Sequence, residues 1–342
     1  MLFARLRALS RRANAPPRAG RAAGMRTISY TAPGFRGPRR AVERVEIPMN
    51  FIQKASACFM KLVTYQFQGE TAVGILTPAG DAVHPVPGVS DMTALIARWP
   101  ELDAAAVCRG DAVPLREVRL LAPIPHPAQD VICLGINFYD HAAESGSVTG
   151  KQDNVPKAAI YFSKRVDEAV APGGAIDSHS DMVRDLDYEA ELAVVIGKPA
   201  YHVREADALD HVFGYTVLND VSARTIQAAH QQWYRGKSLD GFTPIGPWIV
   251  TPDEFDVTRP ARIQSFVNGE PRQDSTIDLL IFDVPHVIAE LSRGMTLRPG
   301  TIISMGTPAG VGMGFDPPRW LRPGDTVTCR VEGIGDLTNT VR

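Results

Sequence analysis

Short apolar runs, each ended by Gly or Pro, make up most of the chain after Met60. The runs "KLVTYQF" and "TAVGIL" are separated only by "QGE", which is typical of a β-hairpin. The segment "DMTALIARW" then predicts a short helix, and a Pro-rich connector ends near Asp130. We therefore expect a leader over residues 1–59, a small N-terminal domain over residues 60–125 and a larger catalytic domain over residues 126–342.

The larger region predicts many strands and few helices. Its apolar runs follow one another closely: "VICLGIN", "AAIYFS", "AELAVVIG", "VFGYTVLND", "PIGPWIV", "RIQSFVNGE", "TIISMG" and "DTVTCRVEG". Clear helical patterns occur in "VSARTIQAAHQQWY" and "DVPHVIAELSRG". Because strands and helices do not alternate regularly, the pattern indicates a β-rich α+β fold and not a doubly wound parallel sheet.

The charge of the chain changes sharply along its length. The net charge of all 342 residues is −2, but residues 1–42 hold ten of the 36 basic residues and no acidic residue. The remainder therefore has 26 basic against 38 acidic residues, a balance of −12. This argues against a nucleic-acid partner, which requires clustered Lys and Arg. The sequence also contains no apolar run of about 18 residues, so we expect no membrane span.

The Arg- and Ala-rich start of the chain allows two explanations. Residues 1–42 contain no acid and would place several apolar side chains on one helical face, as in a mitochondrial transit peptide. A reading frame extended upstream in a GC-rich genome would have the same composition, and the true start would then be Met60. The first explanation places the protein in the mitochondrial matrix and the second in the cytoplasm.

Acidic residues lead directly into an apolar run in "RDLDYEAELAVVIG", residues 184–197. Successive side chains of a strand alternate between its two faces, so Glu189 and Glu191 project together from one face. Two carboxylates this close repel each other, and burial makes the repulsion worse, unless one is protonated or a cation is supplied. The alternative is a solvated strand face at the edge of a sheet.

Asp220 follows the apolar run "VFGYTVLN" and precedes a predicted helix. An Asp at this position commonly caps the helix N-terminus. Together with Glu189 and Glu191, it would instead provide three oxygen ligands without an accompanying Cys. Such a set favours Mg²⁺ or Mn²⁺, with Ca²⁺ as an alternative, over zinc. The four cysteines form no CxxC pair, which also argues against a zinc site.

Three further segments contain candidate catalytic groups. In "GINFYDHAAESG" we expect a short helix closed by Gly146, with His141 and Glu144 on one face, where the carboxylate would orient an imidazole base. Lys237 follows a Gly in a predicted loop before a strand, where an ammonium would stabilise an enolate or oxyanion. An ordinary surface pair and an exposed loop lysine are the respective alternatives.

The Gly-rich turn "SMGTPAGVGMG" would hold a carboxylate through its backbone N–H groups and the Thr307 hydroxyl. It lacks the Lys-Ser/Thr pair of a phosphate-binding loop and the context of a dinucleotide-binding fingerprint. We therefore expect no organic cofactor.

Together these segments resemble the fumarylacetoacetate hydrolase superfamily. The matching pieces run in family order from "CLGINFYDHAAE" through "DLDYEAELAVVIG", "GYTVLNDVSARTIQ" and "GKSLDGFTPIGPWIV" to "LRPGTIISMGTPAGVG" and "LRPGDTVTCRVEGIGDLTNTV". The resemblance implies a mixed β-roll catalytic domain, a homodimer and one divalent ion. The site residues that it implies are metal ligands Glu189, Glu191 and Asp220, a lid-borne dyad of His141 and Glu144, a substrate-facing Lys237, further active-site positions Arg224 and Gln227, and a substrate-carboxylate contact at Thr307.

The chemistry that the resemblance implies is metal-dependent cleavage of a carbon–carbon bond in a small anionic oxo acid. Hydrolysis of acylpyruvates or β-diketo acids and decarboxylation of oxaloacetate-like 2-oxo acids are two variants, in which the dyad activates water and Lys237 stabilises the enolate. An isomerase or hydratase of 2-oxo diacids and a non-catalytic protein that binds a metal or small acid are the alternatives. The chain has the shorter family form, so fumarylacetoacetate itself is not favoured as substrate.

Overall fold

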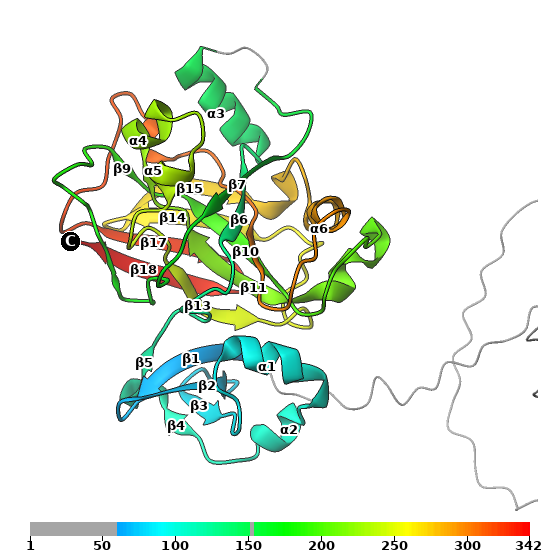
Figure 1. The fold of residues 1–342 in the computed structure, drawn as a ribbon. Coiled ribbons are helices and arrows are strands. Elements are labelled where there is room, and N and C mark those ends of the chain that lie inside the picture. The colour runs from blue at the N-terminus through cyan, green and yellow to red at the C-terminus, as the bar shows by residue number, and fades with distance from the viewer. Residues whose placement is uncertain (1–59, 151–153) are drawn as a thin grey trace, which may run out of the picture. The chain divides into compact units, whose positions relative to one another are not determined.

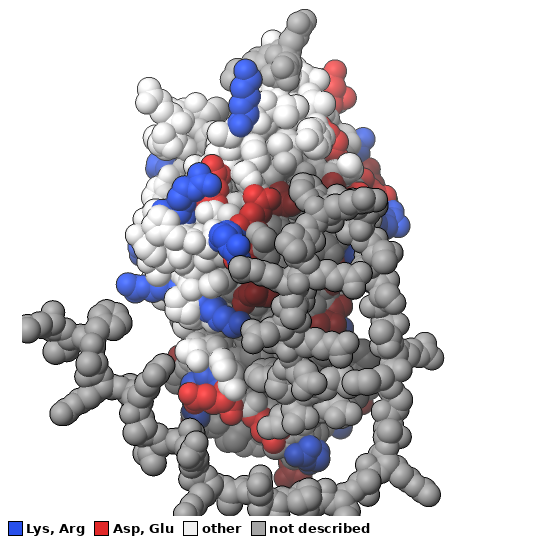
Figure 2. All heavy atoms as spheres, turned by 90° about the vertical axis from the view of Figure 1, so that its right-hand side faces the viewer, with Lys and Arg blue, Asp and Glu red and all other residues white. Residues whose placement is uncertain are grey.

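A computed structural model describes residues 60–150 and 154–342. The predicted leader, with both explanations for it, lies outside the described residues. Within these two ranges, no helix is both long and apolar enough to cross a membrane. The visible, described part of the face in Figure 2 carries basic side chains that stand apart from one another, with acidic side chains among them.

The N-terminal strands form the predicted hairpin. Its two-residue turn is made by Gln68 and Gly69, which both have positive φ, and Asp91 caps the predicted short helix by accepting a hydrogen bond from the Ala94 amide at 2.8 Å. Lys61 pairs with Val250 on a strand of the larger region, so residues 60–125 extend its sheet. The elements are β1 (Lys61–Phe67), β2 (Glu70–Leu76), β3 (Ala82–Pro85), α1 (Met92–Arg98), α2 (Ala104–Val107), β4 (Val113–Pro114) and β5 (Arg119–Leu120).

The largest sheet has the strand order β4-β3-β2-β1-β13-β11-β10-β16-β6-β7, with β5 paired to β1 (Figure 1). Its strands pair antiparallel except at the β16–β6 contact, which is parallel. The central strands β10 and β11 are buried along their whole length. The strands of the larger region in this sheet are β6 (Val131–Gly135), β7 (Ile160–Lys164), β10 (Ala190–Ile196), β11 (Val212–Asn219), β13 (Ile245–Val250) and β16 (Ile302–Ser304).

A second sheet packs against β10 and β11 and has the order β15-β14-β17-β18-β8. The side chains of β10 alternate between two hydrophobic cores. Leu192 and Val194 face the second sheet, whereas Ala193 and Val195 face the core that contains Leu62. The second sheet consists of β8 (Ala175–Ile176), β14 (Arg262–Val267), β15 (Glu270–Thr276), β17 (Thr326–Val331) and β18 (Gly335–Val341), and β9 (Leu186–Asp187) pairs separately with β12 (Ser222–Ala223). This is the β-rich α+β fold that the sequence predicts.

The helices depart from the predictions at several ends. The helices of the larger region are α3 (Tyr139–Thr149), α4 (Arg224–Ala229), α5 (Tyr234–Lys237) and α6 (Val284–Ser292). Among the described residues, 3₁₀ turns span Trp99–Glu101, Leu115–Glu117, Glu205–His211, Ile277–Leu279 and Gly312–Gly314. Gly146 does not close α3: the helix continues to Thr149, and Gly150 ends it with a φ of 72°. Lys237 lies in the helical turn α5 and not in a loop. Figure 1 shows α3, α4 and α5 gathered at one end of the larger region.

Candidate active site

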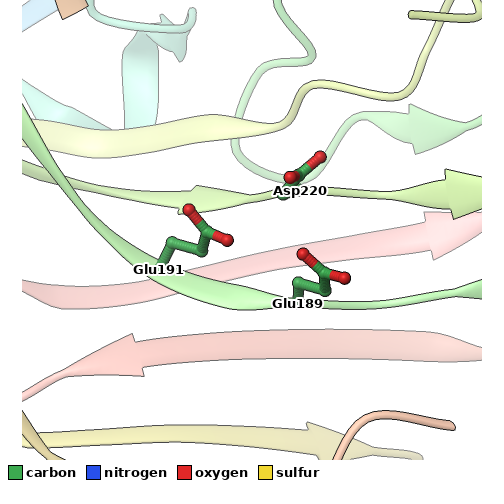
Figure 3. A group of neighbouring side chains, drawn as sticks. All are labelled: Glu189, Glu191 and Asp220. Atoms are coloured by element: carbon green, nitrogen blue, oxygen red, sulfur yellow. The ribbon is translucent and has the colours of Figure 1, made fainter. Parts of the chain in front are cut away.

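The three predicted carboxylates come together. Glu189, Glu191 and Asp220 each place an oxygen within 4.8 Å of the others, and all three residues are buried. Figure 3 shows the two glutamates rising from one chain segment toward the strand end that carries Asp220. The alternative of a solvated strand edge is therefore wrong.

Strand register explains this convergence. Glu191 lies directly opposite Leu218 in the β10–β11 ladder. Since side chains two residues apart share a face, Asp220 projects on the same side as Leu218. The amide of Asp220 also donates to the carbonyl of Glu189 at 2.9 Å, which fixes the end of the ladder.

Asp220 does not cap the helix that follows it. Helix α4 begins after Ala223. Its first turn is satisfied from another segment, because the Asp185 carboxylate accepts hydrogen bonds from both the amide and the hydroxyl of Thr225. Asp185 therefore has the capping role that was the alternative for Asp220.

Two buried lysines hold Asp220. Lys237, predicted from the sequence, donates at 2.8 Å to both Asp220 Oδ2 and Glu189 Oε2. Lys164 was not predicted: it is fully buried and donates at 2.6 Å to Asp220 Oδ1 and at 3.1 Å to the Val221 carbonyl. In the sequence, Lys164 is only a lysine that follows the apolar run "AAIYFS", and nothing in this pattern indicates a role in the site.

Arg224 connects Glu189 to Asp187. Its Nη1 lies 2.7 Å from Glu189 Oε1, and its Nε donates to Asp187 Oδ2 at 2.8 Å. Arg224 Nη1 also donates to Gln227 Oε1 at 3.1 Å. This contact orients the Gln227 side chain through its oxygen, and the amide nitrogen of Gln227 can donate to a molecule in the site.

The pKa values of the cluster reflect its crowding. Burial raises the pKa of Glu191 well above its usual range, and repulsion from Asp220 and Glu189 adds to this. Burial also opposes ionisation of Glu189, but Lys237 and Arg224 outweigh it and lower the pKa of Glu189. For Lys237, burial disfavours the ammonium, yet the Asp220 and Glu189 carboxylates dominate and raise its pKa. Lys237 therefore stays protonated.

The charges in this cluster leave room for a cation. The carboxyl groups of Asp187, Glu189, Glu191 and Asp220 outnumber the three cationic side chains Lys164, Arg224 and Lys237 by one. The raised pKa of Glu191 favours a proton on this carboxyl group, which would balance the excess. A divalent ion held by Glu189, Glu191 and Asp220 would replace that proton, and an all-oxygen ligand set suits a hard ion. The residues thus fit the predicted metal.

The predicted dyad forms on α3. His141 Nδ1 lies 2.9 Å from Glu144 Oε2, and both residues are largely buried. Because Glu144 engages Nδ1, Nε2 is the ring nitrogen that can exchange a proton with a molecule in the adjacent cavity. The alternative of an ordinary surface pair is wrong.

A cavity of about 370 Å³ joins these groups. Of the predicted site residues, His141, Glu189, Glu191, Arg224, Gln227, Lys237 and Thr307 line it, whereas Glu144 and Asp220 lie behind the lining. The Thr307 hydroxyl donates to the Ala190 carbonyl at 3.0 Å and accepts from Gln273 at 2.7 Å. The rest of the lining is mostly apolar and includes Leu134, Phe162, Trp233, Met313, Pro318 and Trp320. A cavity of this size and lining suits a small molecule.

Comparisons with known proteins identify the family of the chain. Residues 130–342 match the family model for the C-terminal region of fumarylacetoacetate (FAA) hydrolase. The chain is 44% identical over 227 residues to oxaloacetate tautomerase YisK of Bacillus subtilis, and the match spans 66% of this chain and 74% of that protein.

Solved structures give the same result. A fumarylacetoacetate hydrolase from Exiguobacterium antarcticum is 40% identical with a TM-score of 0.72, over 83% of this chain and 99% of that one. The maleylpyruvate hydrolase of Sphingobium sp. SYK-6, solved with manganese(II) and pyruvate, is 27% identical with a TM-score of 0.66, over 82% and 98%. A 2-hydroxyhepta-2,4-diene-1,7-dioate isomerase from Mycobacterium marinum is 32% identical with a TM-score of 0.64, over 82% and 98%. The family resemblance seen in the sequence is confirmed, and this chain belongs to the fumarylacetoacetate hydrolase family.

Proposed function

We propose that this protein is a divalent-metal-dependent enzyme that interconverts the keto and enol forms of a small 2-oxo diacid of the oxaloacetate type. The observation that carries the proposal is the placement of the protonated Lys237 and the His141 imidazole around one cavity beside three buried carboxylates. Enolisation needs only a proton-transferring group and positive charge near the ketone oxygen. The 44% identity to an oxaloacetate tautomerase supports the substrate class.

The roles of the residues follow from their contacts. His141 Nε2 takes the proton from the carbon next to the ketone, and the electron pair of the broken C–H bond becomes the carbon–carbon double bond. Glu144 holds the opposite ring nitrogen and favours the imidazolium so formed. Lys237 donates to the enolate oxygen, and return of a proton to that oxygen gives the enol.

Binding of the diacid is assigned to the remaining polar lining. Arg224 and the side-chain amide of Gln227 lie along the cavity and would hold the carboxylates of the substrate. Thr307 would add a hydrogen bond if its hydroxyl turns from the Ala190 carbonyl toward the cavity. An ion on Glu189, Glu191 and Asp220 would add positive charge that acidifies the C–H bond next to the ketone.

Cleavage of a carbon–carbon bond is the second candidate. The observation that favours it is the His141–Glu144 contact, since the same base can activate water for hydrolysis of an acylpyruvate. Loss of CO₂ from oxaloacetate would pass through the same enolate, again stabilised by Lys237.

One panel separates these candidates. The full chain is given oxaloacetate, acetylpyruvate, fumarylpyruvate and fumarylacetoacetate, each with Mg²⁺, Mn²⁺ or EDTA, while keto–enol equilibration, CO₂ release and acid formation are followed in parallel. We expect metal-dependent equilibration of oxaloacetate to be the fastest process. Faster metal-dependent cleavage would establish the second candidate, and activity indifferent to EDTA would contradict both.

Ligand variants test the metal site directly. Glu189→Gln and Asp220→Asn should lose Mn²⁺ binding, measured by calorimetry, while the protein stays folded. Glu101→Gln, an exposed position far along the chain, is the matched control and should bind as the wild type does. Unchanged Mn²⁺ binding in either ligand variant would refute the assignment.

A further inference from the structure

The Gly-rich segment 305–314, called here the glycine loop, holds carboxylates of the protein itself. The sequence suggests that its amides cradle a substrate carboxylate. In the structure, four of its amides donate instead to three acidic side chains of the site, in the pairs Gly306 to Glu191 at 3.0 Å, Gly310 to Glu144 at 2.8 Å, Gly312 to Asp187 at 2.6 Å and Met313 to Asp187 at 3.1 Å. One loop therefore contacts a metal ligand, the dyad and the residue that holds Arg224.

Glu144 is held from two sides. Its Oε2 engages His141 Nδ1 at 2.9 Å, and its Oε1 accepts from the Gly310 amide at 2.8 Å. The two contacts fix both oxygens of one rigid carboxylate, so its plane, and through it the imidazole, is set by the loop as well as by α3. Without the Gly310 contact, Glu144 could rotate away from His141.

Gly314 makes this arrangement possible. A β-carbon at position 314 would overlap the Glu144 carboxylate and lie only 2.9 Å from its Cγ. The backbone of Gly314 does not have a positive φ, so an alanine there is not strained by conformation. The group in the way is the end of a flexible side chain, and the added methyl group would displace that carboxylate with little cost to the fold.

We propose that the glycine loop is the positioning element of the dyad, with Gly314 as a positioning residue that acts through Glu144. The proposal rests on the proposed function for the role of His141. It adds that proton transfer at His141 depends on a loop distant in the chain, since Gly310 and Glu144 are 166 residues apart. The loop decides where the Glu144 carboxylate lies.

The test compares Gly314→Ala with Gly294→Ala, a glycine with no positive φ and with open space where a β-carbon would lie. We expect Gly314→Ala to lower kcat roughly 10²-fold, the effect of a misplacement of about 1 Å, with KM changed much less. The melting temperatures of the two variants should agree. The amide of Gly310, followed by hydrogen exchange, should lose protection in Gly314→Ala and keep it in Gly294→Ala.

A double-mutant cycle tests whether Gly314→Ala acts on kcat through Glu144. In a Glu144→Ala background there is no carboxylate to displace, so Gly314→Ala should cause no further loss of kcat. An equal loss in both backgrounds, or unchanged protection of the Gly310 amide, would overturn the proposal. If the wild type turns over no compound of the panel, the proposed function fails, and the exchange of the Gly310 amide still decides the positioning role.

Discussion

Replacing Lys164 with Met should make the stability of this protein depend on a divalent ion. Lys164 and its partner Asp220 are both fully buried, and their charged atoms lie 2.6 Å apart. Removing one partner of a buried ion pair costs about 3–5 kcal/mol when the other charge stays buried and unpaired. Because Lys237 still pairs with Asp220, we expect the lower end of that range, about 3 kcal/mol. For a chain of this size the loss corresponds to a drop of about 10 °C in the melting temperature of the metal-free protein.

The ion should recover most of that loss. Without Lys164, the four carboxyl groups of the cluster outnumber its cationic side chains by two. A proton on Glu191 would balance only one of these charges, whereas a divalent ion would balance both. Lys237 still holds Asp220 Oδ2 at 2.8 Å, so we expect the orientation of this carboxylate to persist. Removal of an opposing cation then outweighs the lost contact, and Mn²⁺ should bind about tenfold more tightly, equivalent to about 1.4 kcal/mol.

Thermal melting with EDTA and with saturating Mn²⁺, together with calorimetric titration, measures both effects. Lys198→Met, at an exposed lysine, is the matched control and should change neither quantity. Weaker Mn²⁺ binding in Lys164→Met would refute the electrostatic reasoning and show that Lys164 mainly orients Asp220. An equal loss of melting temperature with and without Mn²⁺ would show that the ion does not bind beside Lys164.

Three other perturbations have definite expected outcomes. Since the pKa of Glu191 is raised, an ion that binds the metal-free protein must displace a proton from this carboxyl group. Below that pKa, the affinity for Mn²⁺ should therefore increase up to about tenfold for each unit by which the pH is raised. Calorimetry in two buffers of different ionisation enthalpy measures the proton release. The same shift should make the metal-free protein less stable as pH rises from the ordinary glutamate range toward the raised pKa, because in this range Glu191 binds a proton in the folded state but not in the unfolded state. Melting temperatures measured with EDTA across this range should therefore fall as pH rises. Thr307→Val should lower the free energy of unfolding by about 1–3 kcal/mol, as its buried partners Ala190 and Gln273 lose a hydrogen bond, and a raised KM would show in addition that the hydroxyl contacts substrate. Asp91→Ala should cost about 1 kcal/mol in chemical denaturation and leave Mn²⁺ affinity unchanged, since it removes only the cap of α1.

The parts of the site that the sequence predicts well are those governed by short-range periodicity. Alternation along one strand places Glu189 and Glu191 together, and i, i+3 spacing on α3 places His141 beside Glu144. Both rules apply within a few residues and do not depend on the rest of the chain.

Lys164 shows what such rules miss. Its partner Asp220 is 56 residues away, and they meet because β6 joins β7 to the same sheet that contains β11. No local pattern distinguishes this lysine from one that ends an exposed strand. The end of α3 was misplaced for a related reason: Gly146 and Gly150 are both possible stops, and only the positive φ at Gly150 identifies the actual one.

Asp187 lies two residues before Glu189, so strand alternation alone would place it on the same face as Glu189 and Glu191. Its contacts nevertheless differ from those of the two glutamates. An ionised carboxylate has about four lone-pair sites. Among the described residues, Asp187 accepts from Arg224 Nε and from the amides of Tyr188, Gly312 and Met313, which fills all four.

The three proposed ligands are less saturated. The contacts seen within residues 60–150 and 154–342 occupy about two sites on each of Glu189, Glu191 and Asp220. Their remaining lone pairs can bind a cation, whereas Asp187 has none left and can only hold Arg224 against the glycine loop. The number of hydrogen-bond donors around each carboxylate therefore distinguishes the proposed metal ligands from the structural carboxylate of Asp187. This number depends on contacts between distant parts of the chain, so the local sequence pattern does not show it.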